Sequence, residues 1–310
     1  MYRTELDQLA GLPFAKGHAT GNDFVLLADP EGTKNITAEQ VAALCHRRFG
    51  IGGDGLIRAV PTSKVPGFET QMLDHPKAYW FMDYRNGDGS IAEMCGNGVR
   101  AFVHYLLAEG LINLPIGASV QIGSRAGVKT VTRLVDGYAV NLGPWGLIHE
   151  AKAGEDSVDS LVLAREWEQP HPALSITMGN PHTVVALPEA QLLENLDLTA
   201  LPEVSPAPPQ GTNVEFVVPA DPLINDGVAH IKMRVYERGV GETLSCGTGA
   251  CAAAAAMRYW ARGTALINQW AVEVPGGLVG VEFAATEDGK EDTILSGPAA
   301  LVARGVIGAS

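Results

Sequence analysis

One short sequence pattern occurs twice in this chain and constrains its fold more than any other feature. Each copy reads Tyr-x-x-Gly-x-Gly, then a few polar residues, then Cys-Gly-x-Gly at the start of a helix-like run. The copies are residues 84–98 and 236–249, so Cys95 and Cys246 are separated by about half of the 310 residues. A repeat of this kind predicts two similar halves, each with one cysteine at the start of a helix.

A cysteine at a helix start favours anion binding and thiol chemistry. The first backbone N–H groups of a helix have no partner inside it, and the positive end of the helix dipole lies there. A carboxylate can bind at such a position, and the pKa of a thiol there is expected to be lowered. Flanking glycines let the backbone approach a ligand closely. Two such sites facing each other would hold a carboxylate between two helix ends, with a thiol on each face of the adjacent carbon. That arrangement suits inversion of a stereocentre, in which one sulfur removes a proton and the other returns one.

Composition and charge exclude several classes of protein. The chain is 46% hydrophobic and 18% charged, as ordinary globular proteins are, and its length favours two domains. The net charge of −13 and the lack of a basic run argue against nucleic acid or an anionic membrane as a partner. No apolar run approaches the ~20 residues of a spanning helix, and the N-terminus lacks the apolar core of a signal peptide. We therefore expect a soluble, cytoplasmic protein.

The four cysteines are at positions 45, 95, 246 and 251, without a Cys-x-x-Cys pair. This spacing weakens a zinc or thioredoxin-like interpretation, and we expect no metal and no cofactor. In a reducing cytoplasm the cysteines should be free thiols, although Cys95 and Cys246, if held close together, could join as an inactivating disulfide under oxidation. Cys45 is expected to pack beside apolar neighbours, and Cys251 should face away from Cys246, since five residues turn a helix by roughly 140°.

The order of elements along the chain also repeats. A strand, a Gly-Asn turn and a second strand occur in each half, with Asn22 and Asn180 on the two turns. Thr37 and Gln40 have the spacing of a capping box at the start of a helix. Residues 61–78 are predicted to be a surface insertion and residues 150–172 an acidic loop.

Six motifs carry a resemblance to a known family. They follow in order over nearly the whole chain: Gly21-Asn22-Asp23-Phe24, Glu93-Met94-Cys95-Gly96-Asn97-Gly98-Val99-Arg100, Gly179-Asn180-Pro181-His182, Thr212-Asn213-Val214-Glu215-Phe216, Glu237-Arg238-Gly239-Val240-Gly241-Glu242-Thr243 and Ser245-Cys246-Gly247-Thr248-Gly249. This set resembles the diaminopimelate epimerase family. The resemblance implies an α/β (α+β) fold of two pseudo-symmetric domains, each a curled mixed or antiparallel sheet around a central helix, with the active site in the cleft between them. The expected domains are residues 1–143 with 294–310, the C-terminal strand returning to the first domain, and residues 144–293.

The resemblance also implies an activity and a role for each matching residue. It implies a cofactor-independent epimerase that interconverts LL- and meso-diaminopimelate in lysine and peptidoglycan precursor synthesis, with this small molecule as its partner and a homodimer as an allowed assembly. Cys95 and Cys246 would be the acid/base pair. The backbone at Gly96, Asn97, Gly247 and Thr248 would hold the reacting carboxylate. The substrate's other polar groups would be held by Asn22, Asn86, Asn180, Asn213 and Arg238, with Glu237 beside the reacting amine and His182 near the thiols.

One departure and three alternatives stay open. Some family members carry Gln where this chain has Gly55, so any contact of that Gln is lost here. A thiol-disulfide or peroxide sensor also needs accessible cysteines of low pKa, but not two glycine-flanked helix starts. A non-catalytic amino-acid binding module would be expected to lack one cysteine. A racemase of the same fold acting on proline would not need Arg238 and four asparagines. Taken singly, the asparagines fit turn formers, Glu237 and Arg238 a solvated pair, and His182 a packed histidine.

Overall fold

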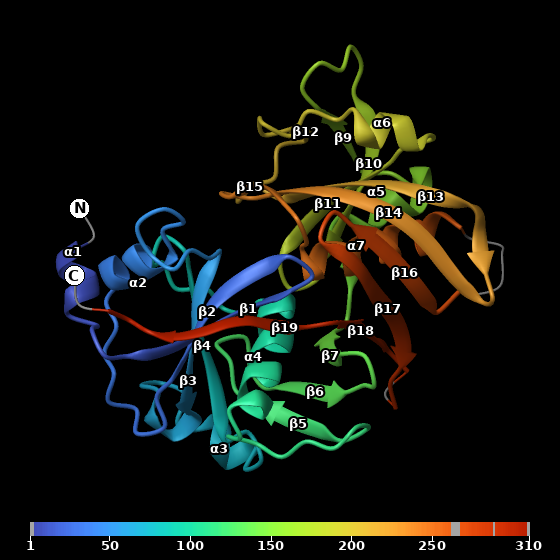
Figure 1. The fold of residues 1–310 in the computed structure, drawn as a ribbon. Coiled ribbons are helices and arrows are strands. Elements are labelled where there is room, and N and C mark those ends of the chain that lie inside the picture. The colour runs from blue at the N-terminus through green and yellow to red at the C-terminus, as the bar shows by residue number, and fades with distance from the viewer. Residues whose placement is uncertain (1–2, 262–266, 288, 309–310) are drawn as a thin grey trace. The chain divides into compact units, whose positions relative to one another are not determined.

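The computed structural model describes residues 3–261, 267–287 and 289–308, which form two compact units (Figure 1). Unit 1 comprises residues 1–140 and 297–310, and unit 2 comprises residues 141–296. Residues 1–2 and 309–310 of the first expected domain, and 262–266 and 288 of the second, lie outside the described residues. The domain boundaries expected from the sequence stay a prediction. Both units combine a large sheet with one central helix, which confirms the predicted fold class.

Unit 1 is built on a mixed sheet in the order β19-β1-β2-β3-β4. Its strands are β1 (Pro13–Ala19), β2 (Asn22–Ala28), β3 (Gly55–Pro61), β4 (Trp80–Asn86) and β19 (Ala300–Val306). The β2–β3 pair is parallel and the other pairs are antiparallel. Strand β19 pairs with β1 (Figure 1), so the C-terminal strand belongs to unit 1, as the resemblance implies.

The central helix of unit 1 is α4 (Gly96–Ala108), which packs on β1, β2, β3, β4 and β19. Val99, Phe102, Val103 and Leu106 recur at helical spacing and are fully buried. Helix α4 begins at Gly96, directly after its N-cap residue Cys95, so the cysteine stands at the helix start that the repeated pattern predicted. The antiparallel ribbon β5 (Ser119–Ile122), β6 (Lys129–Arg133) and β7 (Tyr138–Gly143) follows.

The other helices of unit 1 are α1 (Arg3–Asp7), α2 (Ala38–Cys45), α3 (Gln71–Asp74) and the 3-10 turn η1 (Thr62–Lys64). The predicted capping box is present: the Thr37 hydroxyl accepts from the Gln40 N–H, and the Gln40 side chain accepts from the Thr37 N–H. The expectation of a surface insertion at residues 61–78 is only partly right. Thr62 and Val65 are buried, and the Thr62 hydroxyl donates to the Ala78 carbonyl at 2.6 Å.

Unit 2 contains a longer sheet, in the order β12-β9-β10-β11-β13-β14-β16-β17-β18. Its strands are β8 (Gly146–Leu147), β9 (Ser160–Leu163), β10 (His171–Thr177), β11 (Pro181–Ala186), β12 (Glu203–Ser205), β13 (Asn213–Asn225), β14 (Val228–Glu237), β15 (Gly241–Thr243), β16 (Gln269–Val274), β17 (Gly277–Ala285) and β18 (Glu291–Gly297). The pairs β11–β13 and β14–β16 are parallel. As in unit 1, the sheet is therefore mixed.

The central helix of unit 2 is α7 (Gly247–Trp260), which packs against strands from β10 to β17 (Figure 1). Residues 252–256 are all alanine and all fully buried. Their small side chains let the helix backbone lie close to the strands. Cys251, on the same helix, is fully buried and packs in this core, while Cys45 packs with Val41 and Leu44 in unit 1.

The prediction of a loop at residues 150–172 is wrong. The segment contains α5 (Glu150–Asp156) and β9, and β10 begins at its end; α6 (Ala190–Glu194) follows later in the chain. Ala153 in α5 and Val162 in β9 are fully buried, and Val162 belongs to the same core cluster as Phe216. The two elements are so short, and so surrounded by acidic residues, that tertiary packing rather than local periodicity determines them.

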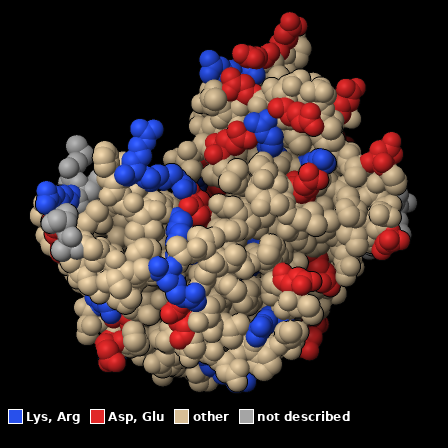
Figure 2. All heavy atoms as spheres, in the orientation of Figure 1, with Lys and Arg blue, Asp and Glu red and all other residues tan. Residues whose placement is uncertain are grey.

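On the face drawn in Figure 2, most of the surface comes from residues other than Lys, Arg, Asp and Glu, and the basic and acidic side chains form scattered groups without a broad basic patch. Within residues 3–261, 267–287 and 289–308, no helix has both the length and the apolar character that crossing a membrane requires.

One buried carboxylate joins three segments of unit 1. Asp83 on β4 accepts from Arg58 Nε at 2.8 Å and from Arg125 Nη2, and its side chain is almost fully buried. Burial by itself would raise the pKa of this carboxyl group, but the hydrogen bond from Arg125 and the charges of Arg58 and Arg125 outweigh burial and lower the pKa.

We therefore expect Asp83→Asn to lower the free energy of unfolding at pH 7 by about 2 kcal/mol. The pKa of Asp83 is lower in the folded than in the unfolded protein, so its stabilisation is present above the unfolded value of about 4 and is lost as pH falls through the folded value. Urea unfolding at several pH values measures this difference, with the exposed Asp74→Asn as control. A difference between wild type and Asp83→Asn that stays constant from pH 7 to pH 3 would contradict this account.

Candidate functional site

Cys95 is the N-cap residue of α4, as the sequence predicted. Its backbone is extended, and its sulfur accepts a hydrogen bond from the Gly98 N–H at 3.3 Å. On another side, the same sulfur donates to Asn22 Oδ1 at 3.4 Å. Asn22 lies at the first position of β2, directly after a tight turn in which Thr20 and Gly21 both have positive φ. Unit 1 thus brings two of its predicted site residues into contact.

Cys246 occupies the corresponding position at the start of α7. Its sulfur accepts from the Gly249 N–H at 3.4 Å and lies 3.6 Å from the Thr248 hydroxyl. A Cβ added at Gly249 would lie 2.7 Å from Glu215 Oε1 and 3.1 Å from Cys246 Cβ. Only glycine fits there without a shift, which gives a physical reason for the second glycine of the Cys-Gly-x-Gly pattern.

The expectation of a lowered thiol pKa is wrong for Cys246. The side chain is buried, and burial raises its pKa well above the ordinary value of a cysteine; the nearby carboxylates Glu237 and Glu215 raise it further. The hydrogen bonds from Thr248 and Gly249 favour the thiolate but do not outweigh these effects. In the structure described here, Cys246 is therefore a neutral thiol at pH 7.

The groups around Cys246 form a buried polar cluster on neighbouring strands. His182 on β11 is fully buried, with Nδ1 2.7 Å from Glu215 Oε1 and Nε2 3.1 Å from Asn180 Oδ1. Glu237, at the end of β14, accepts a hydrogen bond from the Thr243 hydroxyl, and burial raises the pKa of its carboxyl group. Asn180 is therefore hydrogen-bonded to His182. The charge of Glu237 lies close enough to Cys246 to raise the pKa of its thiol.

No role was predicted for Glu215, although it stands inside one of the quoted motifs. Its carboxylate is fully buried on β13, between the ring of His182 and the start of α7. The signal was a single charged residue in the otherwise apolar run Val214-Glu215-Phe216-Val217, since charged side chains are seldom fully buried unless they are paired.

Two further predicted residues of unit 2, Asn213 and Arg238, are in contact with each other. Asn213 Oδ1 accepts from the Arg238 N–H at 2.9 Å, so this asparagine fixes the backbone at the exposed Arg238. The Arg238 guanidinium donates to the Gln210 carbonyl at 2.7 Å. Gly247 and Thr248 are the first two residues of α7, where helix N–H groups have no acceptor within the helix.

The other predicted residues of unit 1 make local contacts. The Asn86 side chain donates to the Ser90 hydroxyl at 3.0 Å, within its own turn. The Asn97 side chain is buried and accepts from the Arg100 guanidinium. Its side chain therefore points into unit 1. The backbone N–H groups of Gly96 and Asn97 lie in the first turn of α4, where a helix has no internal acceptor for them.

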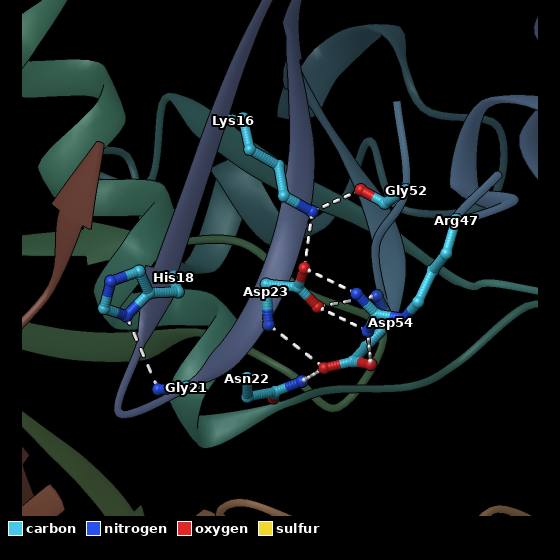
Figure 3. A network of polar contacts seen from close by, with 8 residues as sticks. All are labelled: Lys16, His18, Gly21, Asn22, Asp23, Arg47, Gly52 and Asp54. Carbon is cyan, nitrogen blue, oxygen red and sulfur yellow. Dashed lines mark hydrogen bonds and ion pairs between the residues drawn. The ribbon is translucent and has the colours of Figure 1, made fainter. Parts of the chain in front are cut away.

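A charged network that the sequence did not predict lies behind Asn22 (Figure 3). Asp54 Oδ2 accepts from Asn22 Nδ2 at 2.7 Å, and Arg47 donates to both Asp54 and Asp23. Lys16 pairs with Asp23 at 2.6 Å. Asp54 stands in a glycine-rich loop, residues 50–55, and no local sequence pattern indicates its pairing with Arg47, seven residues earlier.

The structure explains why position 55 is glycine in this chain. Gly55 starts β3, and an added Cβ would lie 2.6 Å from the ring of Tyr84 and even closer to the Arg85 carbonyl. A glutamine, as found in some family members, would require the β3–β4 pair to move.

Within the described residues, no set of three or more His, Cys, Asp and Glu side chains is placed to hold a metal ion.

We expect Glu237→Gln to increase the rate at which iodoacetamide alkylates Cys246 at pH 8 about tenfold. Removing the negative charge lowers the thiol pKa, and one pKa unit changes the thiolate fraction about tenfold while the pKa lies above the assay pH. Mass spectrometry of the Cys246 peptide measures the rate in a Cys95→Ser background. Glu242→Gln is the matched control, because Glu242 pairs with Arg234 at 2.7 Å. Equal rates in the two variants would contradict the electrostatic account of Cys246.

Known proteins are similar to this chain both in sequence and in fold. The family model described as diaminopimelate epimerase matches residues 14–148 and 174–302. A protein named diaminopimelate epimerase from Streptomyces coelicolor is 42% identical over 95% of this chain and 94% of its own. One of the same name from Corynebacterium glutamicum is 40% identical over 96% of this chain and 98% of its own.

Solved structures that are similar to this chain show the same fold at low identity. A phenazine biosynthesis protein of the PhzF family from Bacillus anthracis has a TM-score of 0.64 at 15% identity, over 95% of this chain and 98% of its own. A probable proline racemase from Agrobacterium radiobacter has a TM-score of 0.58 at 16% identity, over 95% and 92%. The family model and the close relatives together show that this chain belongs to the diaminopimelate epimerase family, a family of isomerases.

Proposed function

We propose that this protein interconverts LL- and meso-diaminopimelate without a cofactor, with Cys95 and Cys246 as its two acid/base groups. The substrate rests on the names of relatives that are 40–42% identical over nearly the whole chain. The observation that carries the mechanism is the duplicated helix start: in each unit a cysteine sulfur caps the central helix and accepts one of its first N–H groups. The product would serve lysine and peptidoglycan precursor synthesis.

The helix starts supply the electrostatic part of the mechanism. An amino-acid α-proton is too weakly acidic for a thiolate in water, so the charge that develops on carbon and carboxylate must be stabilised. N–H groups at Gly96–Asn97 and Gly247–Thr248 have no acceptor within their helices and suit this role. Such donors are most effective where water is excluded, because their attraction for charge is then least screened.

The two sulfurs exchange roles in each turnover. One thiolate takes the α-proton, so an S–H bond forms while the C–H bond breaks and its electron pair spreads over carbon and carboxylate. The other thiol then gives its proton to the opposite face of that carbon and becomes the thiolate. The configuration is inverted, and no electrons are gained or lost. Burial and the nearby carboxylates raise the pKa of the Cys246 thiol, which favours its protonated form in the substrate-free protein.

The cluster near Cys246 suits a substrate amine. An ammonium group beside Glu237 would favour ionisation of this carboxyl group, whose pKa is raised in the free protein. At the other end of the substrate, Arg238 can hold a carboxylate with two parallel hydrogen bonds. Asn22, Asn86, Asn180 and Asn213 add neutral donors and acceptors, which a substrate with two amino and two carboxyl groups needs and proline does not.

Solvent-deuterium incorporation at the α-carbon of LL-diaminopimelate tests this proposal, followed by NMR under reducing conditions. We expect wild type to exchange and invert, and Cys95→Ser and Cys246→Ser to lose inversion by at least a hundredfold, because each lacks one acid/base group. Cys251→Ala is the matched control. Its thiol is buried among alanines on α7, away from the helix start, so its activity should stay near wild type.

The other outcomes would move the protein to other classes. Exchange with proline but not with diaminopimelate would make it a proline racemase of the same fold. No exchange with any amino acid, together with ready oxidation of both cysteines, would favour a redox function. Undiminished inversion in either serine variant would contradict the two-thiol mechanism while leaving the substrate intact.

Location and assembly belong to the same proposal. The resemblance supports a cytoplasmic enzyme and allows a homodimer, and sedimentation equilibrium of the purified protein would measure its oligomeric state.

A further inference from the structure

We propose that Asp54 is a positioning residue that fixes the side-chain amide of Asn22, so that the oxygen of this amide faces Cys95 and favours its protonated thiol. The inference rests on the proposed function only in giving Cys95 a chemical role. The contacts that carry it lie within unit 1 and involve β1, β2, the loop after α2 and the start of α4. Figure 3 shows the part of this network around Asn22, Asp23 and Asp54.

The orientation of Asn22 follows from the chemistry of its neighbour. Asp54 Oδ2 lies 2.7 Å from Asn22 Nδ2 and also accepts from the Asp23 N–H at 3.0 Å. A carboxylate oxygen accepts hydrogen bonds and does not donate them, so the NH2 end of the amide must face Asp54. The carbonyl end must then point the other way, where the sulfur of Cys95 lies 3.4 Å from Oδ1.

Asp54 is itself held in place by charged neighbours. Arg47 Nη2 donates to Asp54 Oδ1 at 2.6 Å and to Asp23 Oδ1 at 2.8 Å, and the Asp54 N–H donates to Asp23 Oδ1 at 3.2 Å. Lys16 completes the network at Asp23. Burial by itself would raise the pKa of Asp23, but hydrogen bonds from Arg47 and Lys16 lower it strongly. Two cations therefore hold two carboxylates behind one neutral amide.

The orientation matters because two contacts of the Cys95 sulfur have opposite effects on its protonation. The Gly98 N–H donates to it and so favours the thiolate. The Asn22 oxygen accepts from the S–H and so favours the thiol. If the amide turned over, its NH2 group would face the sulfur and both neighbours would favour the thiolate. By fixing the amide, Asp54 determines the balance.

The network is suited to orienting groups rather than to stabilising the fold. The side chain of Asp54 is 37% exposed and that of Arg47 is 60% exposed, and exposed ion pairs contribute little to stability. We therefore expect Asp54 variants to fold. Along β1, β2, the loop after α2 and residues 93–100, the charged or titratable side chains besides Cys95 are Lys16, His18, Asp23, His46, Arg47, Arg48, Asp54, Glu93 and Arg100.

The test is the pH dependence of Cys95 alkylation by iodoacetamide, read by mass spectrometry in a Cys246→Ser background. Asp54→Asn keeps the shape of the side chain but can accept or donate, so the Asn22 amide becomes free to turn. We expect the midpoint of the alkylation profile to fall by about 0.5 to 1 pH unit. Asp88→Asn is the matched charge control, because Asp88 bonds within its own turn to Ser90, and it should leave the midpoint unchanged.

A second background separates positioning from plain charge. In Asn22→Ala, the substitution Asp54→Asn should leave the Cys95 midpoint unchanged, because the amide through which Asp54 acts is gone. The same shift in both backgrounds would overturn the proposal and show a direct charge effect. If Asp54→Asn caused no shift in the protein that retains Asn22, that result would overturn the proposal as well. The assay contains no substrate, so its result does not depend on whether the protein epimerises diaminopimelate.

A measurement on the unmutated protein covers the case in which Asp54→Asn does not fold. In protein labelled with 15N-asparagine, the side-chain NH2 signals of Asn22 should exchange with solvent more slowly than those of the exposed Asn35, because Asp54 holds them. Exchange as fast as that of Asn35 would overturn the proposal.

Discussion

The hydrogen bond from a helix N–H to a cysteine sulfur is the interaction on which the proposed site depends. It occurs in both units, from Gly98 to Cys95 and from Gly249 to Cys246, and in each case the helix is the central one of its sheet. The helix cores explain why these starts are fixed: α4 buries an apolar stripe, and α7 packs through a run of alanines. Because each cysteine is itself the N-cap, its thiol is held beside the first N–H groups of the helix, which the proposed function assigns to the substrate carboxylate.

The two thiols share this cap but differ in their other neighbours. Cys246 lies near the carboxylates of Glu237 and Glu215, and burial with these charges raises its pKa. Cys95 instead contacts a neutral amide, with the charges of Asp54 and Arg47 one residue further away. A reaction that can run in both directions needs each sulfur to act as acid and as base. The difference implies that the protein tunes the two thiols by separate means, carboxylates in one unit and an oriented amide in the other.

The features that could be predicted from the sequence are those that a local pattern or the internal repeat determines. The duplicated signature located both helix starts, and Thr37 with Gln40 located the start of α2. Prediction failed where packing decides. The short elements α5 and β9 stand in an acidic segment, and Val162 becomes a core residue only once Phe216 is beside it. A lowered pKa was expected for both thiols from the helix dipole alone, but Cys246 has buried carboxylate neighbours from two other strands. Asp54 and Arg47 form their contacts through the fold of a glycine-rich loop, which no spacing rule describes.

The proposed mechanism requires both helix starts to bind the same substrate carboxylate. Titration of 15N-glycine-labelled protein with meso-diaminopimelate, followed by the backbone amide signals of Gly96, Gly98, Gly247 and Gly249, tests it most directly. The account predicts that the signals from both helix starts shift together, with one common dissociation constant, while that of the distant surface glycine Gly154 does not move. Shifts confined to one helix start, or two clearly different dissociation constants, would contradict it.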